Sequence, residues 1–125
     1  MFKKFAFIIL ASLLFFSFSQ VKSANAASSV KIGIFDIKAN SKNYYTSSRL
    51  AKDSSMVFKV TTTTGASYGI QQYKSGSWSK ISSTIHVLKG KSSTYTVKAK
   101  KGEAYRVVIY YKVFERIKGN VYEIL

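Results

Sequence analysis

Aromatic side chains recur beside basic residues in this sequence, and this pairing is the feature best suited to molecular recognition. Exposed rings can stack on sugars or nucleobases, and neighbouring cations can hold phosphates or carboxylates. Some of the same rings would also serve as core residues of a β-structure. The candidate binding residues are Tyr44, Tyr45, Tyr73, Lys74, Trp78, Lys80, Arg106, Tyr110 and Lys112.

The sequence contains few of the residues from which catalytic sites are usually built. The only histidine, His86, lies between Ile85 and Val87, so we expect it at the solvent face of a strand or paired with a hydroxyl. A serine hydrolase would need it beside a serine, and no Gly-x-Ser-x-Gly motif nominates one. The five acidic residues are interpreted as local partners of lysines rather than as paired carboxylates for glycoside hydrolysis. We therefore expect no catalytic residues and no enzymatic activity.

Cofactor and metal sites also lack their usual ligands. One histidine, no cysteine and five scattered carboxylates do not suit a zinc site. The glycines at 65 and 69 are not followed by the lysine and helix of a phosphate-binding loop. The sequence therefore predicts neither a metal nor a cofactor.

The first 26 residues have the organisation of a cleavable export signal. Lys3 and Lys4 precede an apolar run over residues 5–18. This run is shorter than the roughly twenty residues that a membrane-spanning helix needs. We therefore predict a protein that is secreted and could be associated with the cell wall. The absence of cysteine favours a bacterial export route.

Small residues at Ala24 and Ala26 predict cleavage before residue 27, and a second suitable position follows Ser23. No cysteine follows the apolar run that could carry a lipid. Without proline and with few glycines, residues 27–125 show no linker, so we expect one basic β-domain.

The predicted mature domain is strongly basic. Three lysines leave with the signal, so residues 27–125 carry 17 basic and five acidic side chains, a net charge of +12. Such a charge attracts polyanions, and the attraction is screened by salt. The lysines are spread along the chain, which is also compatible with a basic surface that has no ligand.

Alternating polar and apolar residues predict an all-β fold. Residues 104–114 alternate most clearly, with Tyr105 and Tyr111 on the apolar face of a central strand that is covered on both sides. Seven or eight short strands separated by turn signals indicate a small antiparallel β-sandwich, with a small open barrel as the alternative. Further strands are predicted at residues 30–37, 56–62, 67–73, 78–81, 84–88 and 94–98.

Two dipeptides predict hairpins. Ser75-Gly76 would set Tyr73 opposite Trp78 and Ile70 opposite Ile81. Both pairs are favourable across a strand pair.

Gly119-Asn120 would set Arg116 opposite Glu123, again a favourable pair.

For residues 39–55 we predict a long loop with an added short strand near residues 44–47.

Three classes of function remain open. The leading hypothesis is a non-enzymatic secreted module that binds anionic wall polymers or acidic glycans through lysine, arginine and exposed aromatic rings; extracellular nucleic acid is a variant ligand. The second is a cationic antimicrobial protein or toxin that acts on anionic lipid. The third is an inhibitor of an extracellular enzyme that uses the loop at residues 39–55. No membrane span is expected after cleavage of the signal.

Overall fold

A computed structural model describes residues 28–125, so the predicted export signal at residues 1–26 lies outside the described residues. Within the described range the chain forms ten strands and no helix. The strands are β1 (Ser29–Ile37), β2 (Tyr44–Tyr45), β3 (Arg49–Leu50), β4 (Ser55–Thr62), β5 (Ala66–Lys74), β6 (Ser77–Lys80), β7 (Ile85–Val87), β8 (Ser92–Lys98), β9 (Ala104–Ile109) and β10 (Ile117–Ile124).

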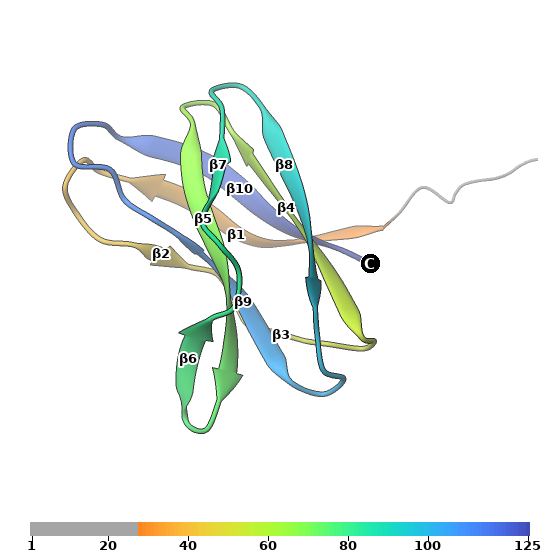
Figure 1. Cartoon of the computed structure of the whole chain (residues 1–125). Helices are drawn as coiled ribbons and strands as arrows, with labels where there is room; N and C mark the ends of the chain where they lie inside the picture. Colours follow the sequence, from red (N-terminus) through yellow and green to blue (C-terminus); the bar gives the residue numbers. More distant parts are fainter. Residues whose placement is uncertain (1–27) are drawn as a thin grey trace, which may run out of the picture.

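The strands form two antiparallel sheets (Figure 1). One sheet has the order β1-β10-β4-β8, and the other has the order β2-β9-β5-β6, with β3 also paired to β9 and β7 also paired to β5. If β2 and β3 are counted as one interrupted strand, and β6 and β7 as another, each sheet has four strands. Every connection except the β5–β6 hairpin then crosses between sheets, which is the arrangement of an eight-stranded jelly roll. The predicted all-β antiparallel sandwich is confirmed.

The core lies between the sheets and is built from alternate residues of each strand. On β4, Met56, Phe58 and Val60 are buried, as the alternation predicts. On β9, Val107 and Ile109 are fully buried and face them from the other sheet. Each such side chain contributes roughly 1.5–3 kcal/mol by leaving water, so the inward faces of the strands supply most of the stability.

The strand predicted over residues 104–114 is shorter in the structure. β9 ends at Ile109, which is its last residue paired with both β2 and β5. Beyond it, the Tyr111 amide donates to Asn43 Oδ1 at 3.1 Å and the chain crosses to the other sheet. Tyr105 is buried as predicted, but Tyr111 is 39% exposed, so its assignment to the core was wrong. The central position of β9 is confirmed, because strands flank it on both sides.

The Ser75-Gly76 hairpin forms in the predicted register. Ser75 and Gly76 both have positive φ, which matches the right-handed twist of the flanking strands. Tyr73 pairs with Trp78, and the Ile81 amide donates to the Ile70 carbonyl at 2.9 Å.

The hairpin predicted at Gly119-Asn120 is wrong. Both residues lie inside β10, which pairs with β1 on one side and β4 on the other. Glycine is required at position 119 because a Cβ would overlap the backbone of Thr61 and the ring of Phe35. The dipeptide therefore marks a close approach of neighbouring groups rather than a turn.

The charge pairing predicted from that hairpin is wrong as well. Arg116 pairs with Asp36 of β1, with Nε 2.6 Å from Oδ1. Glu123 instead pairs with Arg49 of β3, with Nε 2.6 Å from Oε1.

Residues 39–55 do not form a free loop. Their middle part lies along β9 as β2 and β3, so the predicted short strand near residues 44–47 is present at Tyr44–Tyr45. The Thr46 amide donates to the Val107 carbonyl at 3.0 Å, and the Ala51 amide donates to the Glu103 carbonyl at 2.9 Å. These contacts hold the segment against the sheet.

Candidate aromatic and cationic binding face

The outer face of the sheet that contains β9 carries most of the candidate binding residues. Successive side chains of a strand point to opposite faces, so Arg106 and Tyr110 point outward when Tyr105, Val107 and Ile109 point into the core. The same rule turns Gln71 and Tyr73 of β5 outward. Strand pairing sets Gln71 opposite Arg106 and also opposite Lys80.

Arg106 lies at the centre of this face. Its guanidinium carbon lies 4.3 Å from the centroid of the Tyr45 ring and 4.1 Å from that of the Trp78 ring. Its Nε donates to Gln71 Oε1 at 2.7 Å. Because Tyr45 comes from β2 and Trp78 from β6, the contacts hold the cation from both sides of β9.

Partial burial shapes the electrostatics of Arg106. The pKa of its guanidinium is lowered from the usual value, mainly by burial. Burial has this effect because it removes part of the hydration of the cation. Within residues 28–125 no carboxylate lies within 4.0 Å of it. The group is therefore a positioned cation without an acidic partner in the described chain.

Tyr73 and Trp78 extend the face at its β6 edge. Their rings meet edge to face, with centroids 5.3 Å apart and planes at 63°. Tyr73 is 46% exposed and Tyr45 is 45% exposed, so both offer ring surface to solvent. Rings of this exposure can stack on a flat apolar side of a ligand.

A second cation and ring pair lies beside the first. Lys80 Nζ is 5.3 Å from the centroid of the Tyr110 ring. Both side chains cross β5 at Gly69, where a Cβ would lie 2.8 Å from Tyr110 Oη and 3.0 Å from Lys80 Cε. The missing side chain at Gly69 leaves the space that these two groups occupy.

Six of the nine candidate residues thus share one surface. We call it the Arg106 face, and it consists of Tyr45, Tyr73, Trp78, Lys80, Arg106 and Tyr110.

The other three candidates lie elsewhere. Tyr44 points inward, with its ring centroid 6.4 Å from that of Phe35 and its hydroxyl accepting the Ile34 amide at 3.3 Å. Lys74 lies at the β5–β6 turn, where it is opposite Ser77. The spacing in the sequence did not show that Lys74 lies outside the Arg106 face.

Lys112 lies in the β9–β10 loop and pairs with Glu115 at 3.5 Å. The prediction that Lys112 lies on a strand is wrong, because β9 ends before this residue.

All five carboxylates lie outside the Arg106 face. Asp36 and Glu123 are on strands of the other sheet, and Asp53, Glu103 and Glu115 are in connections between strands. The face therefore has cations but no acidic group of its own, which favours an anionic ligand.

His86 lies on the same sheet, paired with a hydroxyl as the sequence suggests. Its Nδ1 is 2.7 Å from Ser67 Oγ, and the two residues are opposite each other on β7 and β5. In the described chain no carboxylate forms an ion pair with His86, so the pair lacks the acid that orients a catalytic histidine. Over residues 28–125 there is also no group of three side chains suited to holding a metal ion.

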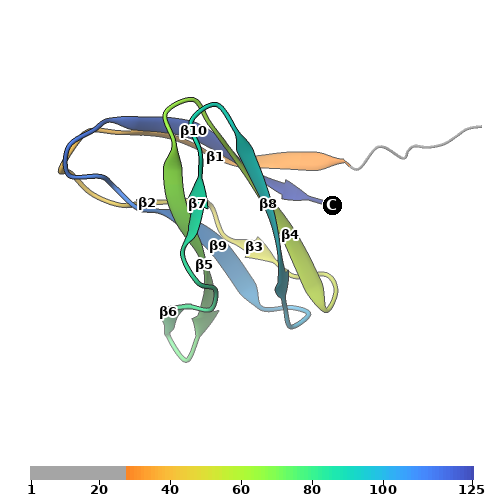
Figure 2. The ribbon, with the colours of Figure 1, turned by 45° about the horizontal axis from the view of Figure 1, so that its top comes forward.

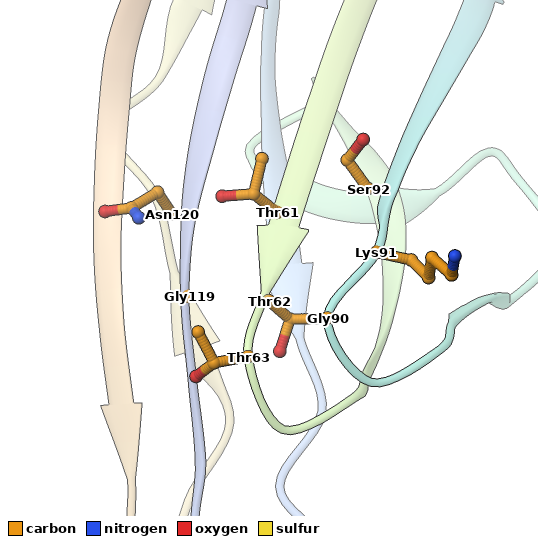
Figure 3. A pocket seen from close by; sticks show the side chains of 8 residues that line it. All are labelled: Thr61, Thr62, Thr63, Gly90, Lys91, Ser92, Gly119 and Asn120. Carbon is orange, nitrogen blue, oxygen red and sulfur yellow. The ribbon is translucent and has the colours of Figure 1, made fainter.

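The other sheet carries a shallow polar depression that the sequence did not indicate (Figure 3). Its volume is about 490 Å³, and β4, β10 and the β7–β8 turn contribute to its lining. Three of the four consecutive threonines at residues 61–64 line it, but the run by itself was read only as strand and turn. The Thr62 hydroxyl is already used, because it donates to the Lys118 carbonyl at 2.7 Å. The lining residues are Thr61, Thr62, Thr63, Gly90, Lys91, Ser92, Gly119 and Asn120.

Comparison with known proteins adds no assignment: no protein-family model matches this chain, and a search of curated proteins finds no significant match. From residue 28 onward, no helix has the length and apolar character needed to cross a membrane.

Proposed function

We propose that this protein is an exported, non-enzymatic module that binds an anionic polymer of the cell surface or matrix, such as a wall polymer or an acidic glycan, through the Arg106 face. The observation that carries the proposal is the position of Arg106, which contacts two rings and has no carboxylate within 4.0 Å in the described chain. A guanidinium suits carboxylate and phosphate groups because it can donate two parallel hydrogen bonds. The hydrogen bond to Gln71 uses only Nε of Arg106, which leaves the two terminal nitrogens of the guanidinium for a ligand.

The aromatic rings supply the second part of the proposed contact. Tyr45 and Tyr73 are each close to half exposed and lie on either side of Arg106 across the sheet. A polymer whose repeating unit joins an apolar ring face to an acidic group would satisfy the rings and the cation together. The net charge of +12 on residues 27–125 would increase the rate of encounter.

The alternative of an enzyme inhibitor loses the feature that suggested it. It rested on a long loop at residues 39–55, and the structure lays this segment along β9.

The test is a binding series on immobilised polygalacturonate, wall teichoic acid, DNA and uncharged dextran at several salt concentrations. We expect retention on a carboxylated or phosphorylated wall-type polymer, no retention on dextran, and release by salt. Competition between DNA and the wall-type polymers identifies the preferred polyanion. Retention on dextran equal to that on the acidic polymers would contradict the proposal.

A charge-matched pair of variants tests the site. Arg106→Gln should weaken binding by at least about tenfold, because it removes charge-assisted hydrogen bonds. Lys98→Gln removes the same unit charge from β8 of the other sheet, and we expect less than about a threefold loss. Equal losses in both variants would show that binding follows total charge and has no site on the Arg106 face.

A further inference from the structure

Four connections meet at one end of the sandwich. They are the loops at residues 38–43, 63–65, 88–91 and 110–116, and we call this region the loop end. In Figures 1 and 2 they lie at the end away from the β6 hairpin, the β1–β2 loop beside the β9–β10 loop and the β4–β5 loop beside the β7–β8 loop.

Hydrogen bonds join these loops to one another. The Asn40 amide donates to the Lys112 carbonyl at 2.7 Å, and at the end of β4, next to the loop at 63–65, the Thr62 amide donates to the Lys91 carbonyl at 3.1 Å. A Cβ at Gly65 would lie 3.7 Å from both Lys112 Nζ and the Lys89 amide nitrogen, so the loop at 63–65 lies against two others. The loop end is therefore one continuous surface.

Large apolar side chains are exposed on this surface. Phe114 is 94% exposed, Leu88 is 73% exposed and Val113 is 52% exposed. A single exposed leucine is ordinary in a folded protein, but Phe114 and Val113 are adjacent at the tip of one loop. Their exposure leaves apolar area that an apolar phase would cover favourably.

Lysines without an ion pair in residues 28–125 lie on the loops of the same end. The two acidic groups near the loop end are both paired: Asp36 with Arg116 at 2.6 Å and Glu115 with Lys112 at 3.5 Å. The exposed lysines without an ion pair in the described chain are Lys38, Lys42, Lys89, Lys91 and Lys118, the last at the start of β10.

We infer that the loop end docks on an anionic lipid surface, with Phe114 and Val113 entering the interfacial region and the lysines facing the headgroups. An interface of this kind offers an apolar phase directly beside negative charge, and aromatic rings accumulate there. A water-soluble polyanion would satisfy the lysines but would leave Phe114 in water. The exposure of Phe114 is what favours a lipid surface over a polymer at this end. None of the residues that would carry the docking, Phe114, Val113 and the five lysines, belongs to the Arg106 face.

The test measures sedimentation of the purified protein with vesicles. We expect binding to equimolar phosphatidylglycerol and phosphatidylcholine, and none to phosphatidylcholine alone. Phe114→Ser should weaken the binding to anionic vesicles by about tenfold. The side chain is almost fully exposed, so the substitution should leave the thermal midpoint unchanged.

Leu50→Ser is the matched control. Leu50 is 65% exposed and lies on β3, away from the loop end, so its loss should leave vesicle binding unchanged. Equal binding by Phe114→Ser and the unmodified protein, or equal losses in Phe114→Ser and Leu50→Ser, would overturn the inference. So would the absence of binding to anionic vesicles.

Insertion has a direct spectroscopic readout. In a Trp78→Phe background, Phe114→Trp places the only tryptophan at the loop tip. We expect its emission to shift to shorter wavelength on anionic vesicles and to stay unchanged with dextran sulfate. A shift with dextran sulfate alone would assign the loop end to a soluble polyanion and overturn the lipid inference.

The two proposals can fail separately. Arg106→Gln should still bind anionic vesicles as the unmodified protein does, and Phe114→Ser should still bind the acidic polymer. Loss of vesicle binding in Arg106→Gln to the same extent as in Phe114→Ser would contradict a separate lipid surface.

Discussion

Arg106 and Trp78 lie in contact across the outer face of one sheet, with the guanidinium carbon 4.1 Å from the centroid of the indole ring. The contact joins central strand β9 to edge strand β6, with β5 between them. A cation over an aromatic ring at a partly exposed position stabilises a protein by roughly 0.5–1 kcal/mol. This contact therefore helps to hold the β5–β6 hairpin on the sheet as well as positioning the cation.

Trp78 is the only tryptophan, so its fluorescence reports on this contact. We expect Arg106→Gln to change the emission of Trp78 and to reduce the free energy of unfolding by about 1 kcal/mol. Arg116→Gln, at an exposed position in the β9–β10 loop, is the control and should leave the emission unchanged. An identical emission spectrum in Arg106→Gln would mean that the two side chains are not in contact in solution.

Among the glycines of the described chain, Gly119 should be the one whose substitution destabilises the fold most. In Gly119→Ala the new methyl group would overlap the backbone of Thr61 and the buried ring of Phe35, so we expect a loss of about 3 kcal/mol in the free energy of unfolding. Gly69→Ala meets only the ends of the Tyr110 and Lys80 side chains, which can move. Its loss should be smaller, about 1 kcal/mol, and urea unfolding of both variants measures the difference. A larger cost at Gly69 than at Gly119 would contradict the packing described here.

Arg49 and Glu123 connect the two sheets, and their removal should have unequal costs. The side chain of Glu123 is 10% exposed and that of Arg49 is 32% exposed. Arg49→Leu leaves a buried carboxylate without its partner and should cost about 3 kcal/mol. Glu123→Gln keeps the shape and leaves a cation that can reach water, so we expect a loss of less than about 1.5 kcal/mol. Thermal or urea unfolding decides the order, and the reverse order would show that burial of Glu123 is not the controlling factor.

Asp36 should make a small contribution to stability that depends on pH. The hydrogen bond from Arg116 is the largest cause that lowers the pKa of Asp36 from its ordinary value of 3.8. A carboxyl with a lower pKa in the folded state stabilises the fold above its unfolded pKa, and this contribution is lost as the pH falls through the folded pKa. We therefore expect the urea midpoint of the unmodified protein to fall more steeply below about pH 4 than that of Asp36→Asn.

The titration of Asp36 itself can be followed by NMR. Arg116→Gln should raise the pKa of the Asp36 carboxyl, because the hydrogen bond and the positive charge are both removed. Lys98→Gln, on β8, should leave it unchanged. An unchanged Asp36 pKa in Arg116→Gln would exclude the pair as its cause.

Local alternation was enough to predict most strands of the described chain. Met56, Phe58 and Val60 are buried as their spacing indicates, because a pleated strand turns every second side chain to the same side. The register of the Ser75-Gly76 hairpin was also predictable, since a two-residue turn determines which residues are opposite each other. Tyr73 and Trp78 were therefore placed together from sequence.

Contacts between segments distant in sequence were not predictable. Gly119-Asn120 has the composition of a turn, yet the crowding by Phe35 and Thr61 that requires the glycine comes from β1 and β4. The end of β9 depends likewise on where β2 and β5 stop pairing with it. Tyr111 therefore lies at the surface although it continues the apolar alternation.

The composition and spacing of residues determined a basic chain of short antiparallel strands, because charge is a sum over residues and alternation is a property of neighbours. Only the tertiary structure decided that Arg106 contacts Tyr45 and Trp78, and that Phe114 remains in solvent in the β9–β10 loop. Both outcomes depend on the order of strands within the two sheets, which arises from packing of the whole core and not from any one segment.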